Sequence, residues 1–211
     1  MLVWINGPFG GGKTQTAYEL HRRLPGSVVC DPEHVGFGLH RMTPRELRRD
    51  FQDLPAWRQG VRQVLERVLT AQPERTVLAP MTLVRAEYFD EIVGALRAEG
   101  HQVRHFALLA ERETVLKRLR ERGLGHLVRI AGGRDAPLRR ESFAVARLDD
   151  CLERLRDERF AEHIRTDRLS VAQVAEKIAA SAGLPISPDR DGPVRGPLRR
   201  AWTGLRHIRL D

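Results

Sequence analysis

Short apolar runs alternate with longer stretches of helical spacing along most of this chain. The apolar runs have the length of buried strands and lie at 2–5, 27–31, 75–82, 103–109 and 163–167. The helical patterns fill the intervals and lie at 17–24, 56–71, 86–98, 111–122, 142–155 and 171–182. Strands that alternate with helices build a parallel sheet with helices on both faces. The pattern therefore predicts an α/β fold around a central five-stranded parallel sheet.

Local signals mark where several of these helices begin and end. Ser142 and Ser170 are expected N-caps, and Gly100 and Gly183 are expected to end the helices before them. Residues 34–55 match neither the strand nor the helix pattern. We expect an irregular insertion there, with apolar anchors among arginines.

The end of the chain differs in composition from the rest. Residues 185–197 contain four prolines, which predicts a linker with little structure of its own. Over 198–211 the residues Leu198, Ala201, Trp202, Leu205 and Ile208 share one helical face among arginines. A basic amphipathic helix of this kind favours an anionic membrane surface. The alternative is that it packs on its own domain or on a homodimer mate.

Composition narrows the setting and the partners. With 36 basic and 28 acidic residues the net charge is +8, which favours phosphate-rich partners. The arginines are dispersed and no stacking-aromatic module accompanies them, so we expect no nucleic-acid role. Cys30 and Cys151 form no paired motif, no apolar run reaches the length of a membrane span, and no secretory signal opens the chain. We therefore expect a cytoplasmic protein, held at the inner face of the cell membrane by its tail.

The stretch after the first strand holds a phosphate-binding motif. Residues 7–14 (GPFGGGKT) match G-x-x-x-x-G-K-[ST] and stand between a strand and a helix, as a P-loop requires. Its glycines let successive N–H groups point into one concavity at a helix N-terminus, where a phosphate chain can sit. We expect Lys13 to reach the β- and γ-phosphates and Thr14 to bind Mg²⁺. The predicted nucleotide-binding loop is Gly7, Pro8, Phe9, Gly10, Gly11, Gly12, Lys13 and Thr14.

An acidic residue ends the second predicted strand. Asp31 stands at a carboxyl strand end, which faces the ligand crevice in sheets of this kind. Two functional roles are open: a Mg²⁺ ligand acting through water, or a general base that takes a proton from an acceptor hydroxyl. The structural alternative is an aspartate that only starts a turn with Pro32.

Other residues are candidates for the acceptor side and for a lid. The insertion and the third strand end supply the expected substrate contacts Glu33, Phe37, Phe51, Thr82 and Arg85. The helix over 111–122 places Arg118 and Arg122 four residues apart and so on one face. The glycine-rich, basic segment over 123–141 is typical of a lid that brings Arg129 or Arg134 to the transferring phosphoryl group, or else of a solvated loop.

Six stretches together resemble the bacterial tunicamycin resistance protein family. They are GPFGGGKTQTAYELHRRL, DPEHVGFGL, DFQDLPAWR, PMTLVRAEYFDEIVGALRAEG, LKRLRER and HIRTDRLSVAQVAEKIAA. The resemblance implies an ATP-binding, P-loop kinase-like domain over 1–184 and resistance to a nucleoside antibiotic that carries a fatty acyl chain. By the same resemblance the nucleotide loop is Gly7 to Thr14, the acid is Asp31, and the phosphate-handling arginines are Arg118 and Arg122. It also implies a membrane anchor over 198–210.

The resemblance leaves two functions open. As an enzyme, the protein would transfer a phosphoryl group from Mg·ATP to a hydroxyl of tunicamycin or of a related sugar-nucleoside, using Lys13, Asp31, Arg118 and Arg122. As a binding protein, it would use ATP to sequester the drug at the membrane without chemistry. The acid after the second strand and the arginine-rich lid favour the kinase.

Overall fold

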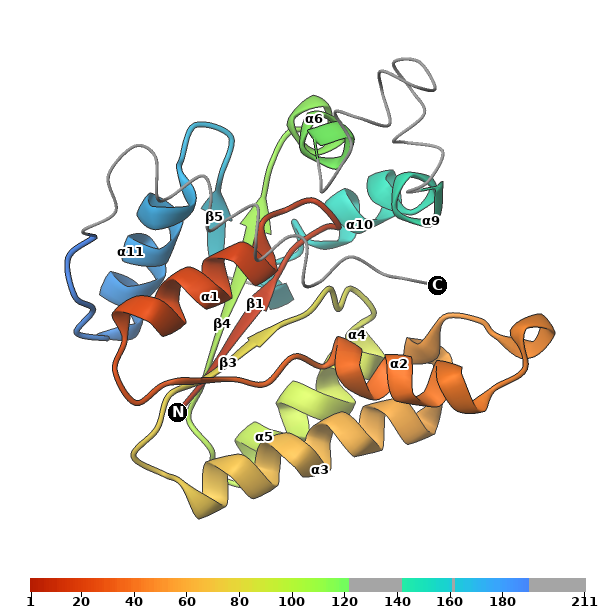
Figure 1. The fold of residues 1–211 in the computed structure, drawn as a ribbon, viewed down its shortest axis with the longest axis horizontal. Coiled ribbons are helices and arrows are strands. Elements are labelled where there is room, and N and C mark those ends of the chain that lie inside the picture. Colours follow the sequence, from red (N-terminus) through yellow and green to blue (C-terminus); the bar gives the residue numbers. More distant parts are fainter. Residues whose placement is uncertain (122–141, 161, 190–211) are drawn as a thin grey trace.

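A five-stranded, all-parallel sheet forms the centre of the computed structural model, which describes residues 1–121, 142–160 and 162–189 (Figure 1). The strands are β1 (Leu2–Asn6), β2 (Val28–Val29), β3 (Val77–Pro80), β4 (Val103–Leu109) and β5 (His163–Arg165). Their order across the sheet is β2-β3-β1-β4-β5. The predicted α/β fold with a five-stranded parallel sheet is therefore confirmed, although β2 is shorter than expected.

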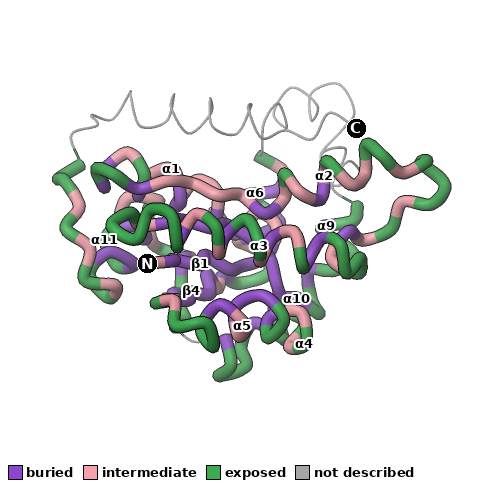
Figure 2. The backbone as a smooth tube through the Cα atoms, turned by 90° about the horizontal axis from the view of Figure 1, so that it is seen from below, coloured by how far each residue is buried: buried purple, intermediate pink, exposed green. Residues whose placement is uncertain are grey.

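The central strand β1 is apolar on both of its faces because helices cover both sides of the sheet. Leu2 and Trp4 belong to the core on one face, and Val3 and Ile5 to the core on the other. The strand pairs with β3, where Leu2 lies opposite Val77, and with β4, where Leu2 lies opposite Val103. Figure 2 shows how the buried parts of the backbone gather at these strands while the outer turns of the helices stay exposed.

Two helices, α1 (Lys13–Arg23) and α11 (Val171–Ala182), cover one face of the sheet. The predicted cap of α11 is present as a capping box, in which Ser170 and Gln173 bond each other's backbone N–H groups. Gly183 ends the helix with φ of 68°. Past the predicted domain end at residue 184, the chain stays on α1. The N–H of Ser187 donates to the Arg23 carbonyl, and Nε of Arg23 donates to the Ser187 carbonyl, each over 2.7 Å.

The opposite face is covered by α3 (Pro55–Ala71) and by a helix with a π-helical middle. That helix consists of α4 (Ala86–Phe89), the π-turn η3 (Asp90–Gly94) and α5 (Ala95–Ala98). The buried Arg58 of α3 joins the two, since its Nε donates to Glu91 of η3 over 2.7 Å. The helix predicted over 86–98 is therefore present, but the sequence pattern did not indicate the wider π-turn in its middle.

A third group of helices stands beyond the carboxyl ends of β4 and β5. It comprises α6 (Arg112–Glu121), α9 (Ser142–Ala146) and α10 (Leu148–Arg154), with the short η4 (Glu158–Phe160) leading into β5. The single helix predicted over 142–155 is wrong, because the chain breaks at Arg147 into α9 and α10. Leu116 and Leu119 of α6 share a small core with Leu148 and Leu152 of α10.

The prediction of an irregular segment over 34–55 is also wrong for its first part. Residues Glu33–Met42 form the helix α2, followed by the 3₁₀ turns η1 (Arg45–Leu47) and η2 (Phe51–Asp53). Gly36 lowers the helix propensity, but a Cβ there would stand 2.6 Å from the Phe51 ring. The glycine that hides this helix from sequence reasoning is therefore the residue that lets Phe51 pack on it.

Several predictions lie outside the described residues. These are Arg122, the lid over 123–141 with Arg129 and Arg134, and the helix over 198–211. Among the helices that the structure describes, none has the length and apolarity to cross a membrane.

Candidate functional site

The P-loop joins β1 to α1 and curls tightly through residues 7–12. Gly10 and Gly12 have φ of 76° and 91°, in the left-handed region that residues with a side chain rarely adopt. The N–H of Gly11 donates to the Pro8 carbonyl over 2.9 Å, and a Cβ on Gly11 would stand 2.8 Å from that oxygen. The glycines thus form the curl, at the N-terminus of α1, that a phosphate chain requires.

Lys13 and Thr14 form the first turn of α1 beside this curl. The Lys13 side chain is buried, and its Nζ donates to the Pro8 carbonyl over 3.0 Å, 5.4 Å from the centroid of the Phe9 ring. The ammonium therefore lies inside the loop. A lysine in this place fits the phosphates of a bound nucleotide, and the half-buried Thr14 beside it carries a hydroxyl of the kind that can hold a Mg²⁺ ion.

A brace of two side chains fixes the start of the P-loop. The amide of the fully buried Asn6 accepts from the N–H of Gly7 (2.8 Å) and of Leu83 (2.9 Å). Its Nδ2 donates to the Leu83 carbonyl (2.7 Å) and lies 3.2 Å from Nε2 of His105. Thr82 donates its hydroxyl to the Gly7 carbonyl over 2.7 Å. Gly7 is therefore held on both of its polar groups by the Asn6–Thr82 brace.

Asp31 and Glu33 lie at the start of α2, after β2. The Asp31 carboxylate accepts from the N–H of Glu33 over 3.0 Å, so the aspartate does start a turn together with Pro32. The N–H of His34 bonds the Asp31 carbonyl over 3.2 Å, which continues that turn into the helix. The structural alternative for Asp31 is thus present in the fold.

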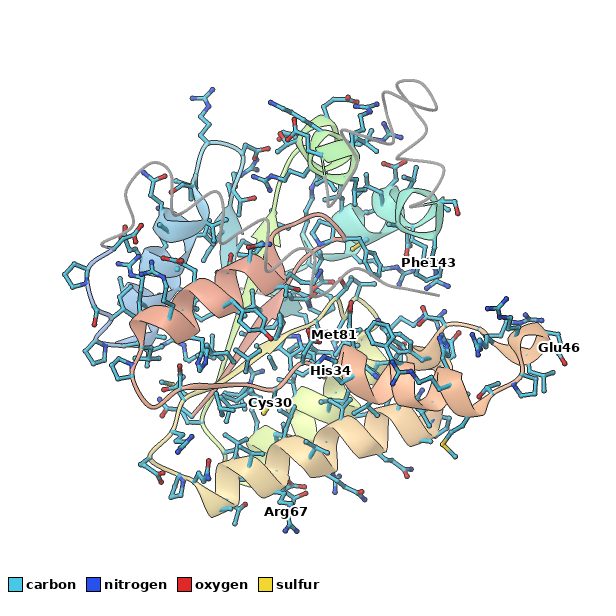
Figure 3. The ribbon with its side chains drawn as sticks, viewed as in Figure 1. Cys30, His34, Glu46, Arg67, Met81 and Phe143 are labelled. Atoms are coloured by element: carbon cyan, nitrogen blue, oxygen red, sulfur yellow. The ribbon has the colours of Figure 1, made fainter. Side chains whose placement is uncertain are left out.

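A cavity of about 980 Å³ is lined by residues of the P-loop, of the segment after α2 and of the helices α9 and α10. Figure 1 shows where these elements stand in the fold. One wall is formed by Arg45 and residues 48–52, and the opposite wall by Phe143, Arg147 and Arg154, with Phe9 at the P-loop. In Figure 3, Phe143 lies on the α9 side, and Glu46 marks the outer tip of the opposite segment. The volume is that of a small-molecule site.

Some of the predicted acceptor residues line this cavity and others do not. Phe51, Thr82 and Arg85 are in its walls, although the Thr82 hydroxyl serves the brace. Phe37 stands against the Phe51 ring, with centroids 6.3 Å apart, and packs on the core. Neither Phe37 nor Glu33 is among the cavity-lining residues of the described ranges.

The charge of the cavity wall is strongly positive. Six arginines and two aspartates line it, namely Arg45, Arg48, Arg49, Arg85, Arg147 and Arg154 with Asp50 and Asp150. Three of these arginines pair with carboxylates: Arg85 with Asp53 (3.0 Å), Arg147 with Asp50, and Arg154 with Asp150 (2.6 Å). The excess of positive charge comes from the other three, which are on η1 and just after it.

Arg118 is placed away from this cavity, on the side of α6 that faces the end of β5. Its guanidinium donates to the Thr166 hydroxyl (3.0 Å) and to the Thr166 carbonyl (2.7 Å). Burial lowers the pKa of Arg118, and the nearby Asp167 opposes that change. The helix itself reaches the P-loop, because a Cβ on Gly10 would stand 3.0 Å from the Leu119 side chain.

Cys151 of α10 lies in the cavity wall as a buried thiol. Burial raises its pKa to about 12, and the nearby Lys13 ammonium offsets a part of that increase. The thiol therefore stays protonated at neutral pH and acts as a small apolar group in the wall.

Sequence reasoning missed two parts of the site that left a signal in the chain. Asn6 is the sole asparagine of the sequence and directly follows the buried strand β1. Phe143, Arg147 and Arg154 recur at spacings of four and seven, which is the sequence pattern of one helical face, although the chain breaks at Arg147. Asn6, as a polar residue at the end of the central strand, indicates the brace. Arg147 and Arg154, at helical spacing from Phe143, indicate the second wall of the cavity.

The chain was compared with known protein families and solved structures. The family model described as "AAA domain" matches residues 2–132. The tunicamycin resistance protein of Deinococcus radiodurans is 33% identical, with a TM-score of 0.69, and the match covers 89% of this chain and 99% of that one. No curated protein matches the sequence.

Other solved structures share the fold at lower identity. The APS kinase of Mycobacterium tuberculosis, in complex with AMPPNP and APS, is 18% identical with a TM-score of 0.54, covering 86% of this chain and 96% of that one. A gluconokinase from Sinorhizobium meliloti is 12% identical with a TM-score of 0.58, covering 86% and 90%. These likenesses show a P-loop kinase-like fold. Together with the 33% identity, they show that the chain belongs to the tunicamycin resistance protein family.

Proposed function

We propose that the protein transfers a phosphoryl group from Mg·ATP to a hydroxyl of tunicamycin or of a related sugar-nucleoside. The observation that carries the proposal is that the small-molecule cavity and the P-loop share the Phe9 and Thr82 region, so an acceptor there would lie next to the bound phosphates. Bound Mg·ATP supplies the γ-phosphoryl group. Catalysis of such a transfer rests on positioning and on neutralisation of charge.

The residues have separate parts in this proposal. Lys13 holds the β- and γ-phosphates from inside the loop, and Thr14 is a ligand of the magnesium ion. Asp31 takes the proton of the acceptor hydroxyl or orients a water on the metal. Arg118 and Arg122 neutralise the moving phosphoryl group, and Arg129 or Arg134 joins them from the lid.

Loss of the key side chains tests the proposal. With purified protein, tunicamycin and γ-labelled Mg·ATP, Lys13→Ala should lower label transfer by about 100-fold or more, since it removes a cation from the transition state. Asp31→Asn should lower it similarly while keeping nucleotide affinity. Two matched controls are Lys177→Ala, an exposed lysine on α11, and Asp157→Asn, whose carboxylate caps the N–H of Arg159 at 2.8 Å in the same kind of turn.

One observation favours the second candidate, drug binding without chemistry. Asp31 is engaged in a turn and is not among the described cavity-lining residues, and the two aspartates that are, Asp50 and Asp150, both pair with arginines. Under that alternative, wild-type protein would leave the drug unlabelled, and Asp31→Asn would protect cells as well as wild type while Lys13→Ala would not. Unmodified drug in the mass spectrum would decide for binding.

We also propose that the tail over 198–211 associates with anionic membranes. Its basic amphipathic pattern supports this role. Deletion of residues 196–211 should release the protein from phosphatidylserine-containing vesicles in a flotation assay and leave ATP binding intact. Equal flotation of the full and shortened chains would show that the tail does not serve as the anchor.

A further inference from the structure

We propose that the acceptor cavity binds a small molecule that carries a phosphate-like anionic group next to an unsaturated ring. The inference rests on one part of the proposed function, namely that this cavity is the acceptor site, and it does not require that tunicamycin is the acceptor. It starts from the six arginines of the cavity wall, of which three pair with carboxylates and three do not pair with any described carboxylate.

Three of the wall arginines have no carboxylate partner among the residues that the structure describes. Within the described residues, Arg45 forms no ion pair or side-chain hydrogen bond, Arg48 donates only to the Thr43 carbonyl (3.0 Å), and Arg49 only to the Arg48 carbonyl (3.3 Å). The guanidinium groups of this trio, Arg45, Arg48 and Arg49, therefore keep most of their donors for a ligand. A planar guanidinium matches phosphate and carboxylate oxygens with two parallel hydrogen bonds.

The trio makes a neutral acceptor a poor fit on its own. A ligand that fills the cavity removes water from guanidinium groups in its wall, and that loss is unfavourable unless an opposite charge or hydrogen-bond acceptors replace the water. The two cavity aspartates cannot serve, since they already pair with Arg147 and Arg154. An anionic group on the ligand would supply the missing counter-charge.

Aromatic side chains across from the trio are suited to a ring. Phe9 and Phe143 meet edge to face with centroids 5.8 Å apart, and Phe143 is 43% exposed although it is a large apolar residue. Arg147 stacks on Phe143 at 4.7 Å from its centroid, which fixes that side chain. A flat ring placed against Phe143 would cover its exposed face and leave an attached phosphate to reach the trio.

Three probes separate the contributions of ring and phosphate: uridine, ribose 5-phosphate and uridine 5′-monophosphate. Their binding is measured by calorimetry with the P-loop saturated with Mg·AMPPNP, so that phosphate binding at Gly7–Thr14 does not contribute. We expect uridine 5′-monophosphate to bind at least about tenfold more tightly than uridine, and more tightly than ribose 5-phosphate. Added salt should reduce its advantage over uridine.

Substitutions in the trio test where the phosphate binds. The double variant Arg45→Gln/Arg49→Gln and the single variant Arg48→Gln should each reduce the preference for the monophosphate over uridine. The double variant changes only exposed side chains, so it keeps the test valid if Arg48→Gln disturbs the loop through Thr43. Arg41→Gln is the matched control, because Arg41 is an exposed arginine of α2 outside the cavity wall, and it should keep the full preference.

The results of these binding experiments can be told apart from the results of the tunicamycin labelling experiment. Equal affinity for uridine and its monophosphate, no measurable binding of either, or a preference that survives the double variant would overturn the assignment, whatever happens to tunicamycin. A trio-dependent preference together with unlabelled tunicamycin would keep the assignment and reject the drug as phosphoryl acceptor.

Discussion

The Asn6 side chain offers the sharpest test of how the P-loop is held. Asn6→Ala would leave three buried backbone groups without their partner: the N–H of Gly7 and the N–H and carbonyl of Leu83. His105 would lose a neighbour at the same time. Because Asn6 has no exposed surface, bulk water cannot take its place directly.

The magnitude follows from those lost partners. A buried polar group left unpaired costs about 1–3 kcal/mol. Three such groups could therefore lower the free energy of unfolding by more than a single substitution usually does. Some relaxation, and a water in the space left by the amide, will recover part of this cost. We expect the free energy of unfolding to fall by about 3–5 kcal/mol. With an m-value of about 2 kcal/mol/M, the urea midpoint should fall by roughly 1.5–2.5 M.

Urea titration followed by tryptophan fluorescence measures the effect. Thr82→Val removes one hydrogen bond to Gly7 instead of several, so it should cost only about 1–2 kcal/mol. Gln63→Ala is the control, since it removes an amide from an exposed position of α3 and should change stability by less than about 0.5 kcal/mol. Both brace variants should weaken Mg·ATP binding. A loss below about 1 kcal/mol for Asn6→Ala would refute the brace.

Two further predictions concern α2 and α10. Gly36→Ala should destabilise the protein by about 1–3 kcal/mol, because the new Cβ would overlap with Phe51. Gly38→Ala on the same helix has open space around it and should be neutral or stabilising by up to about 1 kcal/mol. Thermal melts compare the stability of the two variants with that of the wild type. Native Cys151 should resist iodoacetamide in mildly alkaline buffer and react once the chain is unfolded. Because its folded pKa of about 12 exceeds the unfolded value of 9.0, wild type should lose more stability than Cys151→Ala as pH rises from 9 toward 12; parallel loss would contradict this burial effect.

Periodicity was sufficient for the sheet because apolar residues on both faces leave a clear signal, as in the run before Asn6. The P-loop was predictable for a different reason, since Lys13 and its glycines act through a local turn. Helix α2 was missed because Gly36 and Gly38 reduce local propensity, and the contact that favours the glycine, with Phe51, lies fifteen residues away.

The cavity could be predicted only in part. Its arginines are visible in the sequence, but which of them are neutralised depends on pairs such as Arg147 with Asp50, 97 residues apart. The same limit applies to Thr82, whose place at a strand end is predictable while its bond to Gly7 is not. Pairing across the fold, rather than residue type, decides which groups remain for a ligand.

The position of β1 in the sheet has a consequence for synthesis of the protein. The strand that carries the P-loop is made before both of its neighbours, since β3 and β4 begin at residues 77 and 103. A nascent chain that has not yet reached residue 109 lacks one side of the ladder that holds the loop in place. We therefore expect the ribosome-bound chain to acquire nucleotide affinity late, after β4 has left the exit tunnel, and to depend until then on chaperones that shield its apolar first strand.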